Sequence, residues 1–150
     1  MERYYSGVGA RKTPPVVQED MRRIAKSLRD QGFILRSGGA DGADRAFEAG
    51  AGPAKEIYVP WDGFNDSRDG AVPPDMQGAM ELAARHHPGW RNCSPAARAI
   101  HARNVCIVLG GDLATPSAFL LCWTADCRAS GGTGQAVRVA RAYGVPVIFL

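Results

Sequence analysis

The stretch FILRSGGADGADRAFEAG, residues 33–50, joins an apolar run, a turn of small residues and a helical pattern. The stretch FILRSGG (33–39) is typical of a strand that continues into the turn, and residues 44–49 are typical of a short helix. Four small residues at 37–40 separate the two, so something approaches the backbone closely there. That neighbour is either a ligand or another part of the fold, and the residues leave both interpretations open.

Strand and helix patterns alternate along the rest of the chain. Residues 14–32 carry four apolar side chains at helical spacing, with prolines at the start and Gly32 at the end. Further helices are expected at 76–85, at 94–103 and after the glycine-rich segment at 131–134. Further strands are expected at RYYSGVG (3–9), EIYVP (56–60), VCIVLGG (105–111), AFLLCWT (118–124) and VPVIFL (145–150).

Near-continuous apolar strands separated by helices indicate a parallel sheet that is covered on both faces. We therefore predict an α/β fold: a Rossmann-like, doubly wound, mainly parallel sheet with helices on both faces. The chain has 150 residues, which is long enough for one well-buried domain and short for two. Residues 1–150 are expected to form that single domain.

Composition and charge exclude some classes of protein. The N-terminus has no secretory pattern, and no apolar run reaches the roughly 18 residues of a membrane span. We expect a cytoplasmic protein without a membrane partner. The formal net charge of +3 is compatible with nucleotides or nucleic acid and distinguishes neither.

The cysteines and histidines predict no metal. The four cysteines form no CxxC pair, so no disulfide framework is implied. We expect neither a metal nor another cofactor, because the possible zinc ligands match no finger or zincin spacing. Those side chains are His86, His87, Cys93 and His101.

Three glycine clusters follow expected strands, and the carboxyl ends of parallel strands gather at one edge of the sheet. Glycine lets phosphate oxygens reach the bare N–H groups of helix N-termini. Arg11 could add a bidentate phosphate contact, and Ser37 and Thr133 supply hydroxyl groups. Neither a dinucleotide fingerprint nor a P-loop is present. Each cluster alone is typical of a turn, but together they favour a phosphate-bearing ligand: Gly7-x-Gly9, Ser37-Gly38-Gly39 and Gly131-Gly132-Thr133-Gly134.

Three carboxylates lie near these clusters. Asp41 and Asp44 either stabilise the positive end of the following helix or accept hydrogen bonds from a ribose or a base. Asp126 follows an expected strand at the same edge and could contact a sugar. A carboxylate beside a phosphate is unfavourable, so a ligand-binding carboxylate here must face a hydroxyl or an amine.

Aromatic residues also follow the expected strands. Trp123 stacks on a base or belongs to the core. Trp61 and Phe64 follow the strand at 56–60 at the same edge, where they could wall a pocket.

The segments SGGADGAD (37–44) and GGTG (131–134), together with SGVGARKTP (6–14), resemble the SLOG superfamily. The similarity is to its small DprA/Smf-like, LOG-related, Rossmann-like proteins of bacteria and phages, and it extends over residues 4–150. The resemblance implies a nucleotide site across the two glycine loops, in a homodimer or higher homo-oligomer. Members of this group bind single-stranded DNA, hydrolyse nucleoside monophosphates or sense nucleotide signals.

The LOG branch implies particular residue roles. Its catalytic loop reads Pro-Gly-Gly-x-Gly-Thr-x-x-Glu, and here Gln135 and Arg138 stand at the threonine and glutamate positions. The segment IHARN (100–104) resembles that branch's arginine-containing helix, which implies that Arg103 contacts phosphate or sugar. Without the glutamate, Asp44 and Asp126 are the candidate catalytic acids.

The leading hypothesis is a protein that binds a nucleotide or phosphorylated nucleoside derivative at the carboxyl edge of the sheet. One alternative is a nucleoside-phosphate N-glycosidase, and a second is DprA-like binding of single-stranded DNA. Whether the protein is an enzyme stays open. The predicted ligand-binding residues are Gly7, Gly9, Arg11, Ser37, Gly38, Gly39, Asp41, Asp44, Arg103, Trp123, Asp126, Gly131, Gly132, Thr133, Gly134 and Gln135.

Overall fold

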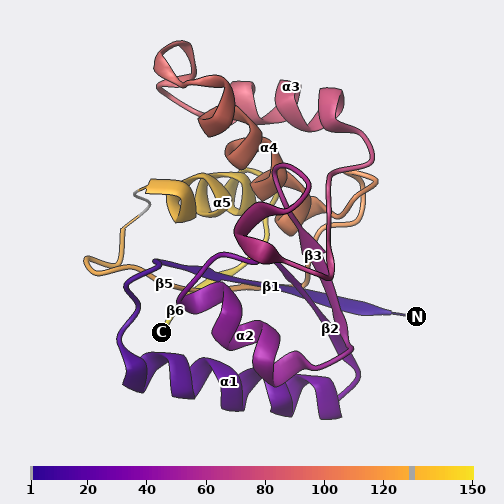
Figure 1. The fold of residues 1–150 in the computed structure, drawn as a ribbon, viewed down its shortest axis with the longest axis vertical. Helices are drawn as coiled ribbons and strands as arrows, with labels where there is room; N and C mark the ends of the chain where they lie inside the picture. Colours follow the sequence, from indigo (N-terminus) through magenta and orange to yellow (C-terminus); the bar gives the residue numbers. More distant parts are fainter. Residues whose placement is uncertain (1, 129–130) are drawn as a thin grey trace.

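A computed structural model describes residues 2–128 and 131–150 (Figure 1). These residues form one sheet with the strand order β4-β3-β2-β1-β5-β6, in which every neighbouring pair is parallel. Its strands are β1 (Arg3–Gly9), β2 (Phe33–Ser37), β3 (Lys55–Tyr58), β4 (Gly70–Ala71), β5 (Leu120–Trp123) and β6 (Val147–Phe149). The helices are α1 (Pro15–Asp30), α2 (Ala43–Ala51), α3 (Met76–His86), α4 (Pro95–Leu109) and α5 (Gly131–Ala142), with single turns η1 (Phe64–Asp66) and η2 (Trp90–Asn92).

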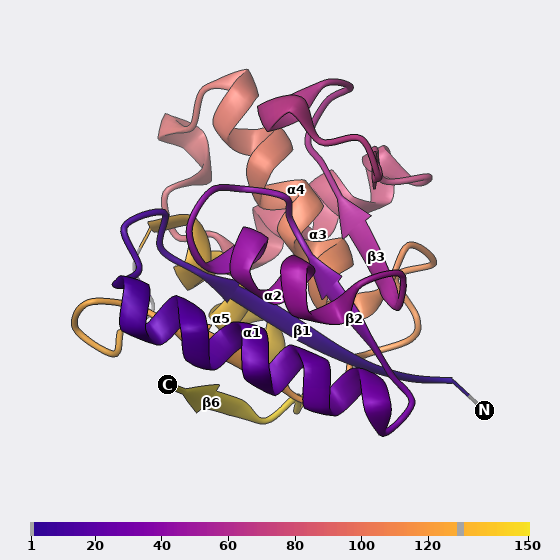
Figure 2. The same cartoon turned by 60° about the horizontal axis from the view of Figure 1, so that its bottom comes forward.

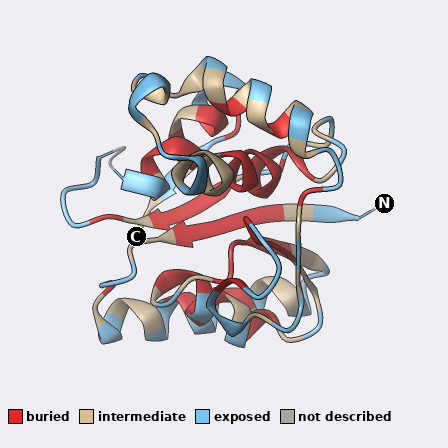
Figure 3. Cartoon of the chain, turned by 45° about the horizontal axis from the view of Figure 1, so that its top comes forward, coloured by how far each residue is buried: buried red, intermediate tan, exposed pale blue. Residues whose placement is uncertain are grey.

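The helices form two layers around the sheet. In Figure 1, α1 and α2 lie below it and α3, α4 and α5 lie above it, and α1 and α2 run side by side across β1 and β2 in Figure 2. Buried residues concentrate where each layer meets the sheet (Figure 3). The predicted doubly wound α/β fold is confirmed.

The strand order reverses beside β1. The chain moves from β1 outward through β2, β3 and β4, then crosses to β5 and β6 on the other side. Ligands of doubly wound sheets bind outside the carboxyl ends of the strands at such a reversal. Here it lies between β1 and β5, where Gly9 is level with Trp123.

The strand predicted at 105–111 is wrong. Residues 105–109 belong to the second half of α4, which therefore continues beyond its predicted end at residue 103 to Leu109, and Gly110 and Gly111 follow the helix. All eight residues from 102 to 109 are buried, because α4 lies between the sheet and the helices α3 and α5. A helix covered on all sides loses the alternation of polar and apolar faces that identifies a helix in a sequence.

Two further local predictions need correction. The strand β4, which pairs with β3, was expected to be part of a polar loop, and it has only two residues. The glycine-rich segment at 131–134 was expected to be a loop before a helix, but it forms the first turn of α5. Within the described residues, no helix is long and apolar enough to cross a membrane.

Candidate functional site at the carboxyl edge

A cavity of about 380 Å³ opens at the carboxyl edge, beside the point where the strand order reverses. The loops after β1 and β2 form one side, and α4 and the start of α5 form the other. This is the position at which the sequence placed the ligand site. The lining residues are Val8, Gly9, Ala10, Arg11, Ala40, Asp44, Ala97, Ile100, His101, Arg103, Asn104, Gly132, Thr133 and Ala136.

A buried carboxylate and a buried guanidinium face this cavity from opposite layers. Asp44 lies in the first turn of α2 and is 6% exposed, and Arg103 lies in α4 and is 4% exposed. Asp44 Oδ2 accepts a hydrogen bond from Ala40 N–H at 3.3 Å. Arg103 donates to Gly38 O, and to Tyr58 O at 3.1 Å. The arginine therefore connects α4 to the loop that follows β2 and to the last residue of β3.

Burial changes the protonation of Asp44. Removal from water raises the pKa of its carboxyl group from 3.8 to about 6, and the positive charge of Arg103 opposes this rise. A carboxyl group with a pKa near neutrality, in a cavity, is suited to accepting and returning a proton. Asp44 is thus the better placed of the two candidate acids.

The opposite wall presents the N-terminus of α5. Gly132 and Thr133 lie in its first turn, where unpaired N–H groups and the helix dipole favour an anion. Asn104 Nδ2 donates to Gly132 O at 3.0 Å and so fixes this turn against α4. Among the residues that the structure describes, the nearest atom that a Cβ on Gly132 would meet outside its own helix is Asn104 Nδ2 at 3.9 Å, which leaves the backbone here open to a ligand.

A second cavity, of about 250 Å³, adjoins the first, because Arg11 and Ala40 line both. Its other walls are Asp41, Trp61, Phe64 and Asn65. Trp61 is 42% exposed and contacts Phe64 edge to face, with ring centroids 5.5 Å apart. An exposed tryptophan beside an exposed arginine offers a surface for stacking a base near a phosphate contact.

Several small residues of the predicted site have a packing role. A Cβ atom on Gly7 would lie 2.7 Å from the Phe47 ring, so this glycine lets α2 approach β1. Ser37 is fully buried and its hydroxyl donates to Gly7 O at 2.6 Å. Gly38 packs directly against the Arg103 guanidinium, and Gly39 has the positive φ of 70° that a turn requires. None of these four lines either cavity.

Five further residues of the predicted site also lie outside both cavities: Trp123 at the end of β5, and Asp126, Gly131, Gly134 and Gln135 beyond it. Trp123 packs against the apolar cluster of the lower layer. Asp126 is exposed, and its Oδ1 accepts from Arg128 N–H at 3.1 Å. Gln135 is fully buried and donates to Ala83 O at 3.1 Å. Gly131 is exposed and Gly134 is buried.

Sequence reasoning missed the α4 wall of the cavity. Ala97, Ile100, His101 and Asn104 line it, and only Arg103 of this helix was expected to contact a ligand. Ala97, Ile100 and His101 lie in the part of α4 that was predicted as a helix, but the sequence does not show which face of that helix turns toward the cavity. The Arg138 side chain, at the catalytic glutamate position of the LOG branch, donates to Gln135 Oε1 at 2.9 Å and does not line either cavity.

Sheet order and site together define a doubly wound, Rossmann-like α/β protein with a cavity at the strand reversal. No family model matches the sequence, and no curated protein is similar to it. The fold is similar to that of DNA processing protein A from Helicobacter pylori, whose structure was described for its single-stranded DNA binding mode. The TM-score is 0.66 at 19% identity, over 98% of this chain and 64% of that one. This similarity supports the expected DprA-like fold.

Proposed function

We propose that this chain binds single-stranded DNA along the carboxyl edge of its sheet. The supporting observation is a fold similar to that of a protein described as binding single-stranded DNA, combined with a cavity of suitable chemistry at the strand reversal. This reverses the order of the hypotheses drawn from the sequence, in which a free nucleotide came first. In this proposal, one nucleotide of the strand occupies the larger cavity and its neighbour stacks at Trp61.

In this proposal, each group at the edge contacts a different part of the DNA strand, according to its charge. Arg11 lines both cavities. A phosphate bound between them contacts the Arg11 guanidinium on one side and the N-terminus of α5 on the other. Asp44 is unsuited to phosphate and contacts a base amino group or a sugar hydroxyl. The exposed Trp61 stacks a base, which is worth about 1–3 kcal/mol in other single-strand binding proteins.

The first test is the fluorescence anisotropy of a labelled oligothymidine titrated with the protein. Affinity should fall steeply as salt rises, because phosphate binding releases counterions. Arg11→Ala should weaken binding and flatten the salt dependence. Lys26→Ala is the matched control: it removes the same charge from an exposed position in α1 and should bind as the wild type does. Equal losses in the two variants would assign the effect to net charge and overturn the site.

A second variant tests the α5 N-terminus. A Cβ atom on Gly132 meets only Asn104 Nδ2, at 3.9 Å, and an acidic residue in the first helical turn does not oppose folding, so Gly132→Asp is expected to fold. The new carboxylate would repel a phosphate, so binding should be lost while the unfolding temperature is retained. Undiminished binding by the folded variant would contradict the placement of the phosphate.

A free nucleotide is the second candidate ligand, favoured by the size of the larger cavity. A volume of about 380 Å³ lies in the range of small-molecule sites and fits one nucleotide unit. A panel of nucleoside monophosphates should then raise the unfolding temperature without DNA present. Base release from one of them, abolished by Asp44→Asn, would establish the N-glycosidase. Stabilisation without base release would indicate binding alone.

A further inference from the structure

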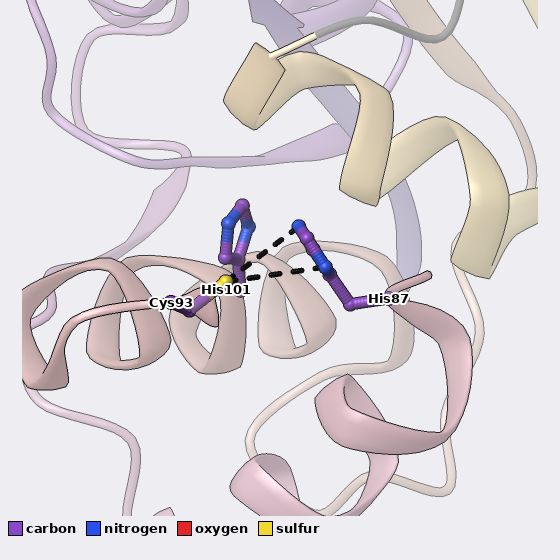
Figure 4. Close-up of side chains that lie close together, drawn as sticks. All are labelled: His87, Cys93 and His101. Carbon is purple, nitrogen blue, oxygen red and sulfur yellow. Dashed lines mark hydrogen bonds between the residues drawn. The ribbon is translucent and has the colours of Figure 1, made fainter. Parts of the chain in front are cut away.

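Three metal-binding side chains converge at the corner between α3 and α4, next to the larger cavity. His87 directly follows α3, Cys93 follows η2, and His101 lies in the second turn of α4. One donor atom from each of the three lies within 4.8 Å of the others. Figure 4 shows the Cys93 thiol beside the imidazole of His87, with Sγ 4.0 Å from each ring nitrogen. The ring centroids of His87 and His101 are 4.2 Å apart.

We propose that His87, Cys93 and His101 bind a zinc ion. Two imidazole nitrogens and one thiolate form a donor set that zinc prefers, and three protein ligands leave a fourth position open. Zinc bonds of about 2.0–2.3 Å place tetrahedral ligand atoms roughly 3.3–3.8 Å apart. The observed cluster therefore needs to contract by only about 1 Å, which small side-chain rotations supply.

The loop from 87 to 93 holds its two ligands in place. Cys93 N–H donates to Trp90 O at 3.1 Å, and the Cys93 thiol donates to Gly89 O at 3.5 Å. Gly89 N–H donates to His87 Nδ1 at 3.0 Å. An ion bound at His87 Nδ1 would take the lone pair of that nitrogen and so replace its hydrogen bond from Gly89 N–H. The thiol would lose its proton to solvent as the zinc–sulfur bond forms.

His101 supplies an independent observation that favours an ion. Its Nδ1 atom is buried, and no hydrogen-bond partner for it is present among the described residues. Leaving such an atom unpaired costs free energy that a bound ion would recover if this nitrogen is its ligand.

The site has a consequence for the neighbouring cavity. Among the residues that the structure describes, no fourth histidine, cysteine, aspartate or glutamate joins the cluster. His101 also lines the larger cavity, so an ion held by its ring would lie near that cavity, and water or an oxygen of a bound ligand would fill the fourth position. The ion would also fix the α3–α4 corner, which carries the α4 wall of that cavity. This inference is independent of the proposed DNA binding.

Cobalt substitution tests the site directly. The full chain is treated with a chelator, freed of it, and titrated with Co²⁺ under reducing conditions. One equivalent should give a thiolate-to-cobalt charge-transfer band in the near ultraviolet together with visible bands of low coordination number. Zinc should then displace the cobalt and remove both. Wild-type protein that gives no charge-transfer band would overturn the proposal.

Matched cysteine variants identify the thiolate. Cys93→Ser should abolish the charge-transfer band and weaken zinc binding by more than about 100-fold, the upper end of the loss from a supporting residue. Cys127→Ser removes another accessible thiol and should leave the band unchanged. A band that survives in Cys93→Ser, or disappears in Cys127→Ser, would overturn the site. If Cys93→Ser does not fold, His87→Gln replaces it, and an unaltered cobalt spectrum in that variant contradicts the proposal.

Discussion

The two helical layers of this protein bury their helices in different ways. In the lower layer, α1 presents one apolar stripe to the sheet and to α2, with only Met21 and Ala25 fully buried. In the upper layer, α4 passes between the sheet and two other helices, and its residues 102–109 are all buried. The same secondary structure therefore has a clear helical pattern in α1 and a continuous apolar run in α4. Burial on all sides, rather than strand structure, produced the run.

The largest expected difference in the free energy of unfolding comes from placing an aspartate in α4 and, for comparison, in α1. Ile107 in α4 is 1% exposed, whereas Val16 in α1 is 71% exposed. Ile107→Asp buries a carboxylate without a partner and should cost more than about 5 kcal/mol, so little folded protein is expected. Val16→Asp should change the free energy of unfolding by less than about 0.5 kcal/mol. Yield and urea unfolding followed by circular dichroism measure both.

Alanine substitutions at the same two positions test the same difference in burial if Ile107→Asp gives no soluble protein. Ile107→Ala should cost about 2–5 kcal/mol and Val16→Ala close to nothing. Similar losses at the two positions would contradict the different burial of the two layers.

The same contrast explains which parts of the fold were predictable. The strands predicted at 3–9, 33–39 and 56–60, which correspond to β1, β2 and β3, were found because each is a short apolar run that ends in a turn signal. The two-residue strand β4 carries no pattern, because pairing with β3 alone defines it. The second half of α4 was misassigned because nothing in a fully buried helix marks which face is polar.

The site was predictable where its residues follow a strand. Arg11 and Asp44 were found through the rule that parallel strands end at one edge, and both line the cavity. Gly7 and Gly38 were assigned to a ligand, and packing against Phe47 and Arg103 accounts for them. A sequence does not distinguish a glycine that makes room for a ligand from one that makes room for a neighbouring helix or side chain. The convergence of Cys93 with two histidines depends on a loop whose shape the spacing does not reveal.

Asp44 and Arg103 lie at the carboxyl edge, one in each layer, and the pH dependence of stability tests the comparison there. Asp44 of the lower layer has a pKa raised to about 6 by burial, although Arg103 of the upper layer lowers it in part. The folded protein thus keeps this proton at pH values where the unfolded chain has lost it. Stability from this group is fully present below about pH 4 and is lost as the pH rises through 6, a change of about 3 kcal/mol.

Asp44→Asn removes that dependence. The free energy of unfolding of the wild type, minus that of the variant, should fall by up to about 3 kcal/mol between pH 4 and pH 7. Urea unfolding at several pH values measures the difference, and the other carboxyl groups cancel in it. Parallel curves for the two proteins would show that Asp44 titrates as an exposed carboxyl group does.

The smallest expected effect concerns how the two helices begin. Ser94 caps α4, its hydroxyl oxygen accepting a hydrogen bond from Ala97 N–H at 3.1 Å. Pro14 precedes α1, which begins with a proline and has no side-chain cap. Ser94→Ala should cost about 1 kcal/mol, and Ser94→Gly only a few tenths, because glycine leaves the N–H groups open to water.

The two Ser94 variants distinguish a helix-capping role of this side chain from a packing role at the α3–α4 corner. Both lose the hydroxyl, so equal and large losses would mean that the α3–α4 corner needs this side chain for packing. A loss confined to alanine assigns the contribution to the helix start. The buried half of α4 would then be stabilised by its neighbours and its exposed start by a single local hydrogen bond, whereas α1 starts from the fixed backbone of its prolines.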